Sequence, residues 1–118
     1  MAERTTIDLL QGTLGVLILK SLSWGPMHGY GIARWIEQIA TQDLLIEEGS
    51  LYPALHRLEK QGWLDSEWKL TENKQRAKYC RLTATGRRQL QTERTRWTRF
   101  SKAIARVLGG RSPLTVHR

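Results

Sequence analysis

Polar side chains suited to contacting another molecule gather between residues 50 and 60. In that stretch Leu51, Leu55 and Leu58 follow the i, i+4, i+7 spacing of a helix face that turns toward a core. The opposite face then carries two hydroxyl groups, an imidazole, two cations and a proline. These residues are Ser50, Tyr52, Pro53, His56, Arg57 and Lys60. A helix of this kind fits the DNA major groove, about 12 Å wide, and presents donors to base edges.

The side chains on this face also have structural interpretations. Tyr52 either contacts a phosphate or thymine methyl group, or packs under a neighbouring hairpin. His56 is either a contact to a phosphate or base, or an ordinary surface histidine. Arg57 either bonds guanine through two hydrogen bonds, or forms an ion pair with Glu59 or Asp65. We predict DNA contact for Tyr52, and the sequence leaves Arg57 open.

Two further places could meet phosphates. His28 and Tyr30 open the preceding helix, where backbone N–H groups point outward, although Tyr30 could equally lie in the core. A polar loop between two stretches of period-two alternation carries the second group of cations: Lys74, Arg76 and Lys78. Such a loop either reaches adjacent phosphates or the minor groove, or is simply a solvated turn.

The alternation around that loop predicts a β-hairpin over about residues 63–83. One face of its first strand is formed by Leu64, Ser66, Trp68 and Leu70. In its second strand, residues 78–82, Cys80 and Leu82 are expected to point inward. Because an isolated hairpin is only marginally stable, it must pack on the helices.

The charge distribution favours a polyanionic partner. The net charge is +8, and residues 1–68 carry 5 Lys/Arg against 9 Asp/Glu. Residues 69–106 carry 12 Lys/Arg against 2 Asp/Glu, so the excess positive charge belongs to the second half of the chain. A basic half on a near-neutral body suggests nucleic acid. The alternative is a solvated basic helix face.

No catalytic chemistry is visible in the residue pattern. Cys80 is the single cysteine, which excludes an internal disulfide and a two-cysteine zinc clamp and fits a reducing cytoplasm. Glu47 and Glu48 are adjacent, so their carboxylates do not converge on a helix. We therefore expect no enzyme, no metal and no cofactor. The absence of a long apolar run or a secretory pattern predicts a cytoplasmic protein without a membrane span.

The spacing of apolar residues predicts four helices around the hairpin. The first runs roughly from Ile7 to Ser21, the second starts near His28, and the third runs from about Glu48 to Gly62. Thr83 or Thr85 then caps a long helix that ends near residue 108. This order predicts a mainly α (α+β) winged helix-turn-helix over residues 1–83, a dimerisation helix over 84–108, and a loose tail over 109–118.

The long helix carries a seam of apolar residues. Leu90, Trp97 and Ile104 are seven apart, and Phe100 and Val107 follow three residues behind, as in an a/d heptad pattern. The seam predicts a homodimer, and Trp97 with Phe100 either fills its core or forms an aromatic wall for a flat effector. The other tryptophans are most simply core or interface residues: Trp24, Trp35, Trp63 and Trp68.

Three ordered segments resemble the PadR family of bacterial transcription regulators. They are the segments GPMHGYGI, EGSLYPALHRLE and RAKYCRLT, at residues 25–32, 48–59 and 76–83. The resemblance spans roughly Leu9 to Leu108 and is to the short branch with one C-terminal helix. It implies a dimeric winged-helix repressor, and the family's members that respond to phenolic acids or drugs suggest an effector between the subunits. Cys80 stands where that branch commonly has an aromatic residue, which we interpret as packing only.

These observations together predict a homodimeric, sequence-specific DNA-binding regulator. Its partner is a pseudo-palindromic double-stranded operator with half-sites about 34 Å apart, and repression is released by a small effector, for which an aromatic molecule is one candidate. The alternatives are a winged-helix RNA-binding protein and a protein-interaction adaptor. A monomeric RNA-binding protein has no reason to expose the apolar seam, which favours the dimer.

Overall fold

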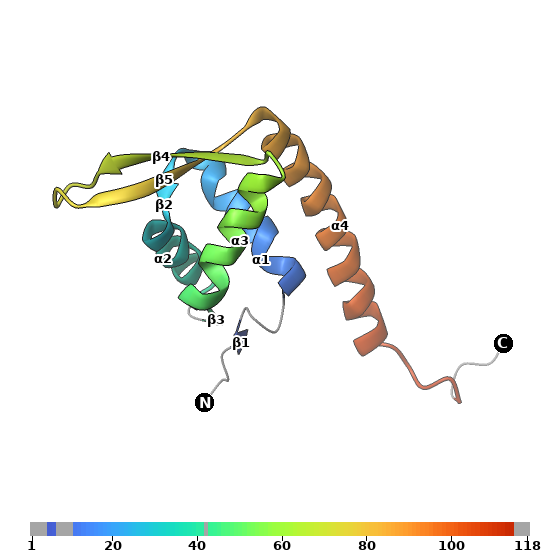
Figure 1. Ribbon diagram of the computed structural model, residues 1–118. Helices are drawn as coiled ribbons and strands as arrows, with labels where there is room; N and C mark the ends of the chain where they lie inside the picture. Colours follow the sequence, from blue (N-terminus) through green and yellow to red (C-terminus); the bar gives the residue numbers. More distant parts are fainter. Residues whose placement is uncertain (1–4, 7–10, 42, 115–118) are drawn as a thin grey trace.

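The computed structural model describes residues 5–6, 11–41 and 43–114, and Figure 1 shows their arrangement. Its helices are α1 (Gln11–Ser21), α2 (Gly29–Ile39), α3 (Glu48–Lys60) and α4 (Ala84–Leu108), with a short 3-10 turn, η2 (Leu22–Trp24), after α1. The predicted start of the first helix at Ile7 and the last four residues of the predicted tail lie outside the described residues. The mainly α winged-helix fold that the sequence predicts is confirmed.

Helix α1 lies at the centre of the body and contacts α2, α3 and α4. The apolar stripes predicted for the first three helices meet there, and Ile18, Ile32 and Leu51 are at most 1% exposed. The core is completed mainly by leucines from α1, α3 and the hairpin. Burial of these side chains, worth about 1.5–3 kcal/mol each, fixes the three helices against one another.

The hairpin forms as predicted and is extended by a third, short strand. Strand β4 (Leu64–Leu70) pairs antiparallel with β5 (Arg76–Leu82), and β2 (Met27–His28) pairs with the other edge of β5. The second hairpin strand begins at residue 76, two residues earlier than predicted. The sequence pattern predicts neither β2 nor the two-residue parallel pair of β1 (Thr5–Thr6) and β3 (Leu44–Leu45).

The inner half of the hairpin packs on the body, and its outer half, the wing, projects from it (Figure 1). Leu64, Cys80 and Leu82 are buried, as their alternation predicts. Trp68 and Leu70 continue the same face but are 58% and 64% exposed, because the sheet extends beyond the helices at that point. The predicted shared face is therefore correct in register, while its outer members do not belong to the core.

A compact set of hydrogen bonds joins the end of α3 to the start of α4. Gly62, with φ of 80°, ends α3 as predicted, and the Trp63 N–H donates to the carbonyl of Leu58. The Thr83 hydroxyl donates to the Gly62 carbonyl at 2.7 Å and accepts from the Gly86 N–H at 2.9 Å, so Thr83 is the predicted cap. These bonds place the two helix ends side by side across the base of the hairpin.

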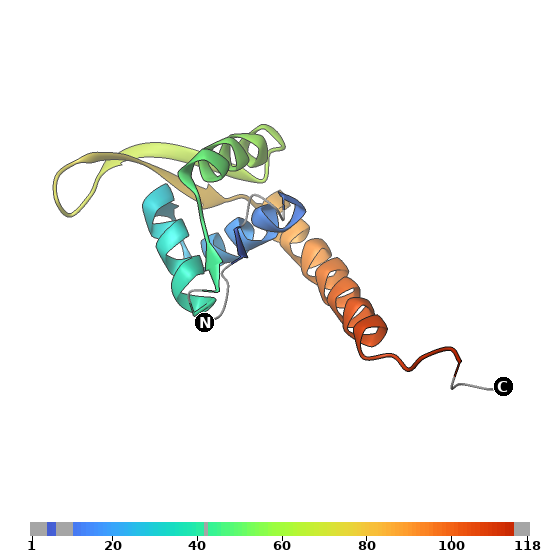
Figure 2. The same cartoon turned by 90° about the horizontal axis from the view of Figure 1, so that it is seen from below.

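Helix α4 packs on the body only through its first turns and then runs away from it. A Cβ atom at Gly86 would lie 2.0 Å from the Trp63 carbonyl oxygen, so only glycine allows this close crossing. Leu90 is buried, whereas from Gln91 onward the α4 side chains are exposed or at most half-buried. The described part of the chain is accordingly elongated, with extents of 65 × 36 × 21 Å, and Figure 2 shows α4 leaving the side opposite the wing.

Candidate DNA-binding surface

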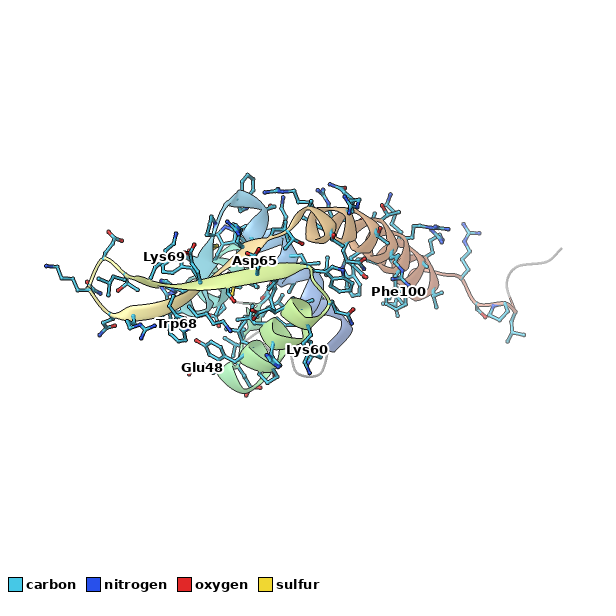
Figure 3. All side chains as sticks on the ribbon, turned by 45° about the horizontal axis from the view of Figure 1, so that its top comes forward. Glu48, Lys60, Asp65, Trp68, Lys69 and Phe100 are labelled. Carbon is cyan, nitrogen blue, oxygen red and sulfur yellow. The ribbon has the colours of Figure 1, made fainter. Side chains whose placement is uncertain are left out.

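Helix α3 buries one face and leaves the predicted polar face open. Leu51, Ala54, Leu55 and Leu58 enter the core, and Ser50 is half-buried. The exposed side chains are those predicted to contact DNA: Tyr52, Pro53, His56, Arg57 and Lys60. In Figure 3, Lys60 and Glu48 mark the two ends of this helix beneath the wing that carries Trp68 and Lys69.

Tyr52 joins α3 to the start of α2 while keeping half of its surface exposed. A Cβ atom at Gly29 would lie 2.8 Å from Tyr52 Cε1 and 2.9 Å from its hydroxyl, so a glycine is needed to admit this ring. The exposed fraction of Tyr52 is 51%. The ring therefore packs on the start of α2, where the structural interpretation expects packing under the hairpin, and it also lines an open groove.

That groove, which we call the wing groove, separates the start of α2 from the wing. It has a volume of about 890 Å³ and is lined by aromatic rings and cations that include Tyr30, Tyr52, Trp68, Arg34 and Arg76. Tyr30 is 67% exposed, so the alternative that it lies in the core is wrong. Rings with nearby guanidinium groups suit phosphates and the sugar edge of a duplex.

Arg34 belongs to this groove, although the sequence pattern did not single it out. Its guanidinium lies 5.9 Å from the centre of the Tyr30 ring. Arg34 follows Tyr30 by four residues on α2, and that spacing alone places two side chains on the same face of a helix. His28 caps α2 by accepting the Gly31 N–H at Nδ1, which leaves its ring against Tyr79.

Arg57 does not form either of the ion pairs considered from the sequence. Glu59 accepts the Ser66 hydroxyl at 2.9 Å and pairs with Lys78 at 3.3 Å. The Ser66 hydrogen bond, helped by Lys78, lowers the pKa of Glu59 below its ordinary value despite an opposing effect of burial. Asp65 is occupied by Arg81, at 3.0 and 3.1 Å. Within the described residues Arg57 thus keeps an exposed guanidinium without a carboxylate partner.

The three predicted wing cations occupy different settings. Lys74 lies at the tip, where its φ of 61° places the backbone in the left-handed region. Arg76 lies over the Trp68 ring, with its guanidinium carbon 5.0 Å from the ring centre. Lys78 is held at the base by Glu59. Lys74 at the tip and Arg76 are therefore the wing cations best placed to meet a phosphate.

The projecting half of α4 exposes most of the predicted seam. Trp97, Phe100, Ile104 and Val107 are 41%, 55%, 43% and 77% exposed, and the Trp97 and Phe100 rings lie 5.6 Å apart. Figure 3 labels Phe100 on this part of the helix, away from α3 and the wing. Leu90, predicted with the same seam, is instead buried in the chain's own core, because α4 still contacts α1 at that turn.

The remaining tryptophans divide between the core and the surface. Trp35 and Trp63 pack against the core. Trp24 and Trp68 are 70% and 58% exposed and instead lie beside cations, Lys20 and Arg76, so neither is a core residue of this chain. Aromatic rings on the surface next to cations are stabilised by cation–π attraction of about 0.5–1 kcal/mol.

Among residues 5–6, 11–41 and 43–114, no group of three or more His, Cys, Asp or Glu side chains could hold a metal ion. Cys80 is buried, and the burial raises the pKa of its thiol. No helix in this part of the chain is long and apolar enough to cross a membrane.

An exposed third helix beside a basic hairpin, on a body of three packed helices, defines a winged-helix protein of the DNA-binding class. The sequence pattern of the PadR-like family of transcriptional regulators matches residues 18–92, and the chain belongs to that family. It is therefore a transcriptional regulator.

Its relatives and structural neighbours agree with this assignment. The chain is 39% identical over 97 residues to the transcriptional regulator Rv3488 of Mycobacterium tuberculosis, covering 80% of this chain and 82% of that protein. It is similar to a transcriptional regulator from Clostridium thermocellum, Cth-833, with a TM-score of 0.75 and 31% identity over 84% of this chain and 96% of the other. A PadR family regulator from Eggerthella lenta gives a TM-score of 0.71 at 33% identity, with 89% of each chain covered.

Proposed function

We propose that this regulator is a homodimeric repressor that recognises a pseudo-palindromic operator in double-stranded DNA. The observation that carries the proposal is the outward face of α3, where Tyr52, His56 and Arg57 are exposed while every carboxylate considered for Arg57 is engaged elsewhere. An arginine without an internal carboxylate partner on a helix of this shape suits a two-bond contact to guanine in the major groove. The same side of α3, which would approach the DNA, also carries Ser50 and Pro53 at its start and Lys60 at its end.

The wing is proposed to position the protein rather than to read bases. Lys74 at the tip and Arg76 over Trp68 reach beyond the body, where the phosphates flanking the α3 contact would lie. Lys78 acts in this scheme from the wing base, where Glu59 orients it. Tyr30 at the start of α2 adds a contact from the opposite wall of the wing groove.

The homodimer is proposed from the exposed stripe of α4. Trp97, Phe100, Ile104 and Val107 present apolar surface on a helix that has already left its own body. A second copy of the chain covers such a stripe through a self-complementary interface with two-fold symmetry. Two-fold symmetry places two α3 helices in successive major grooves, which requires half-sites about 34 Å apart.

An effector site between the two subunits is proposed at Trp97 and Phe100. Their rings lie 5.6 Å apart and keep about half of their surface exposed, so a planar aromatic molecule could stack between rings of the two subunits. Its binding would change the spacing of the α3 helices and release DNA. A Trp97→Leu variant that stays dimeric is expected to lose the ligand response, and an unchanged response would assign Trp97 to the dimer core alone.

Selection of bound duplexes from a random pool tests the DNA-binding proposal. Enrichment of a two-fold symmetric sequence, with affinity that falls as salt rises, is the expected result, because phosphate contacts release counterions. A pool without enrichment would favour an adaptor. Stronger binding to RNA by a monomeric chain would favour the RNA-binding alternative, and mass measurement in solution separates the two.

A further inference from the structure

The proposed operator contacts use few of the cations that make the chain basic. Helix α4 alone carries seven Lys and Arg residues and one acidic residue, Glu93. Like charges spaced three or four apart destabilise a helix. Glu93 relieves little of this, because it pairs with Arg96 at 3.3 Å and accepts from Gln89. The helix therefore keeps most of its positive charge uncompensated within the described residues.

These cations and their polar neighbours form a continuous strip along one side of α4. A hollow of about 340 Å³ between α1 and α4 is lined by Lys20, Ser23, Arg87, Arg88, Leu90, Gln91 and Arg94. A second hollow of about 390 Å³ shares Gln91 and Arg94 and continues to Thr95, Thr98 and Arg99. We call this strip the arginine track, and define its cations as Lys20, Arg87, Arg88, Arg94 and Arg99.

The arginine track lies on a different side of α4 from the apolar stripe. At about 100° per residue, Arg88 and Arg99 lie roughly opposite Trp97 and Ile104 on the helix. A second copy of the chain that covers the stripe consequently leaves Arg88 and Arg99 open, whereas Arg94, about 60° from Trp97 around the helix, lies at the edge of the stripe. In both Figure 1 and Figure 2 the projecting half of α4 also runs away from α3 and the wing.

The track resembles the outer end of the wing, and differs from the rest of the hairpin, in how its cations are paired. On the hairpin, Lys69, Lys78 and Arg81 each have a carboxylate within 4 Å, whereas Lys74 and Arg76 have none that close among the described residues. None of the track cations has a carboxylate that close among the described residues, and Arg88 donates instead to the neutral Thr85 hydroxyl at 3.3 Å. Cations that a protein leaves without a carboxylate, with hydroxyl and amide groups between them, suit an external anion.

We propose that the arginine track is a second, sequence-independent surface for the phosphate backbone of duplex DNA. From Arg87 to Arg99 it extends about 18 Å along the helix, which spans roughly five phosphates of one strand. Its guanidinium, hydroxyl and amide groups are those that contact phosphate and sugar. From Arg87 to Arg99 its lining has no aromatic side chain of the type that anchors protein interfaces, which favours DNA over an acidic protein. The exposed Trp24 ring lies beside Lys20, at the α1 end of the track. The regulator then holds two DNA segments, one on α3 and one on α4.

A two-duplex capture experiment tests this inference, which rests on the proposed function only for the first duplex. The full-length protein is loaded on an immobilised selected duplex at saturation, so that both α3 helices are occupied, and a labelled random duplex is added. The track variant combines Arg88→Gln and Arg99→Gln. The matched control combines Arg96→Gln and Arg111→Gln, which removes the same charge from exposed cations outside the track, α3 and the wing.

We expect the wild type and the control to capture the random duplex and the track variant to fail to capture it at physiological salt. The salt slope of random-duplex binding should fall by about 0.9 for every phosphate that the track variant no longer neutralises. Equal capture by both variants, failure of both variants, or no capture by the wild type would overturn the proposal. So would a track that binds anionic vesicles but no duplex.

Two readouts keep this result separate from the operator proposal. Affinity for the selected duplex alone is expected to change little in the track variant, and circular dichroism is expected to show an intact α4, because the changed side chains are exposed. If random-pool selection yields no preferred duplex, the operator proposal fails. The track is then still tested by binding random duplex to protein tethered directly to the surface.

Discussion

The wing and the projecting half of α4 both leave the same three-helix body, but they are held in different ways. The hairpin that ends in the wing is fixed by polar contacts within the chain, from Ser66 and Lys78 to Glu59 and from Arg81 to Asp65. The projecting half of α4 makes no comparable contact with the body in the described part of the chain, and exposes apolar side chains on one side and cations on another. The base of the hairpin is therefore held by contacts within a single chain, whereas the projecting half of α4 has no such contacts in the described residues. Beyond its base the wing also exposes apolar side chains, Trp68 and Leu70.

The largest effect is expected from charges placed on the apolar stripe of α4. Trp97→Glu with Ile104→Glu should convert the dimer to a monomer, because burying two carboxylates against apolar side chains costs several kcal/mol. Light scattering measures the change as a halved mass. Lys102→Glu, on another side of the same helix, should leave the dimer intact. A wild type that stays monomeric at high concentration would contradict both the dimer and the palindromic operator.

A second change acts where the two extensions meet. Gly86→Ala should destabilise the chain by roughly 1–3 kcal/mol, because its Cβ would lie 2.0 Å from the Trp63 carbonyl oxygen at the hairpin base. Chemical denaturation measures the free energy of unfolding. Gly49→Ala is the control, since a Cβ there meets nothing within 4 Å and alanine favours helix by about 1 kcal/mol. Equal stabilities of the two variants would show that the crossing of α4 over Trp63 tolerates displacement.

A third change separates reading by α3 from positioning by the wing. Arg57→Ala should relax sequence preference, by about 1–3 kcal/mol if the guanidinium bonds guanine through two hydrogen bonds. Lys74→Ala and Arg76→Ala should instead weaken selected and random duplexes alike and lower the salt slope by about 0.9 each. Competition binding over a salt series measures both effects. The reverse pattern, with the wing variants losing discrimination at particular base pairs, would make the wing the reader.

The smallest expected effect concerns the contact that holds the wing base. Because the pKa of Glu59 is lowered in the folded chain, its carboxylate stabilises the fold above the ordinary pKa of a glutamate. That contribution disappears as the pH falls through the lowered pKa. Glu59→Gln should therefore cost less than about 1 kcal/mol at neutral pH and nothing in strong acid, since the pair is partly exposed. A pH series of denaturation curves measures the difference, and a constant difference would exclude the charge as its cause.

The elements that position the site could be predicted from the sequence because their signals are local. Leucine spacing in α3, the period-two alternation of the hairpin and the Thr83 cap each depend on a few neighbouring residues, and each is found in the structure. Strand β2 could not be predicted because two residues carry no periodicity. It forms only because β5 offers an unpaired edge beside Met27 and His28.

The side-chain partners of the site could not be predicted in the same way. The sequence leaves Arg57 with either guanine or a carboxylate, Glu59 or Asp65, as its partner. Both carboxylates are occupied only because Lys78 and Arg81 lie beside them on β5. Leu90 follows the heptad spacing of the seam, yet the place where α4 leaves α1 decides that it belongs to the core. Spacing identifies which residues share a face, whereas three-dimensional packing decides what covers that face.

The hydrogen bonds of Thr83 to Gly62 and Gly86 hold the start of α4 at one point, so a change in its tilt is largest at its far end. With 25 residues α4 is about 37 Å long, so a tilt of roughly 10° about Thr83 moves its far end by about 6 Å. The pivot, Thr83, is hydrogen-bonded to Gly62, which follows the end of α3, so α4 is joined at its start to the helix proposed to contact DNA. In the proposed dimer, the angle at which the two α4 helices cross would set the distance between the two α3 helices, and the proposed effector would act by changing that angle.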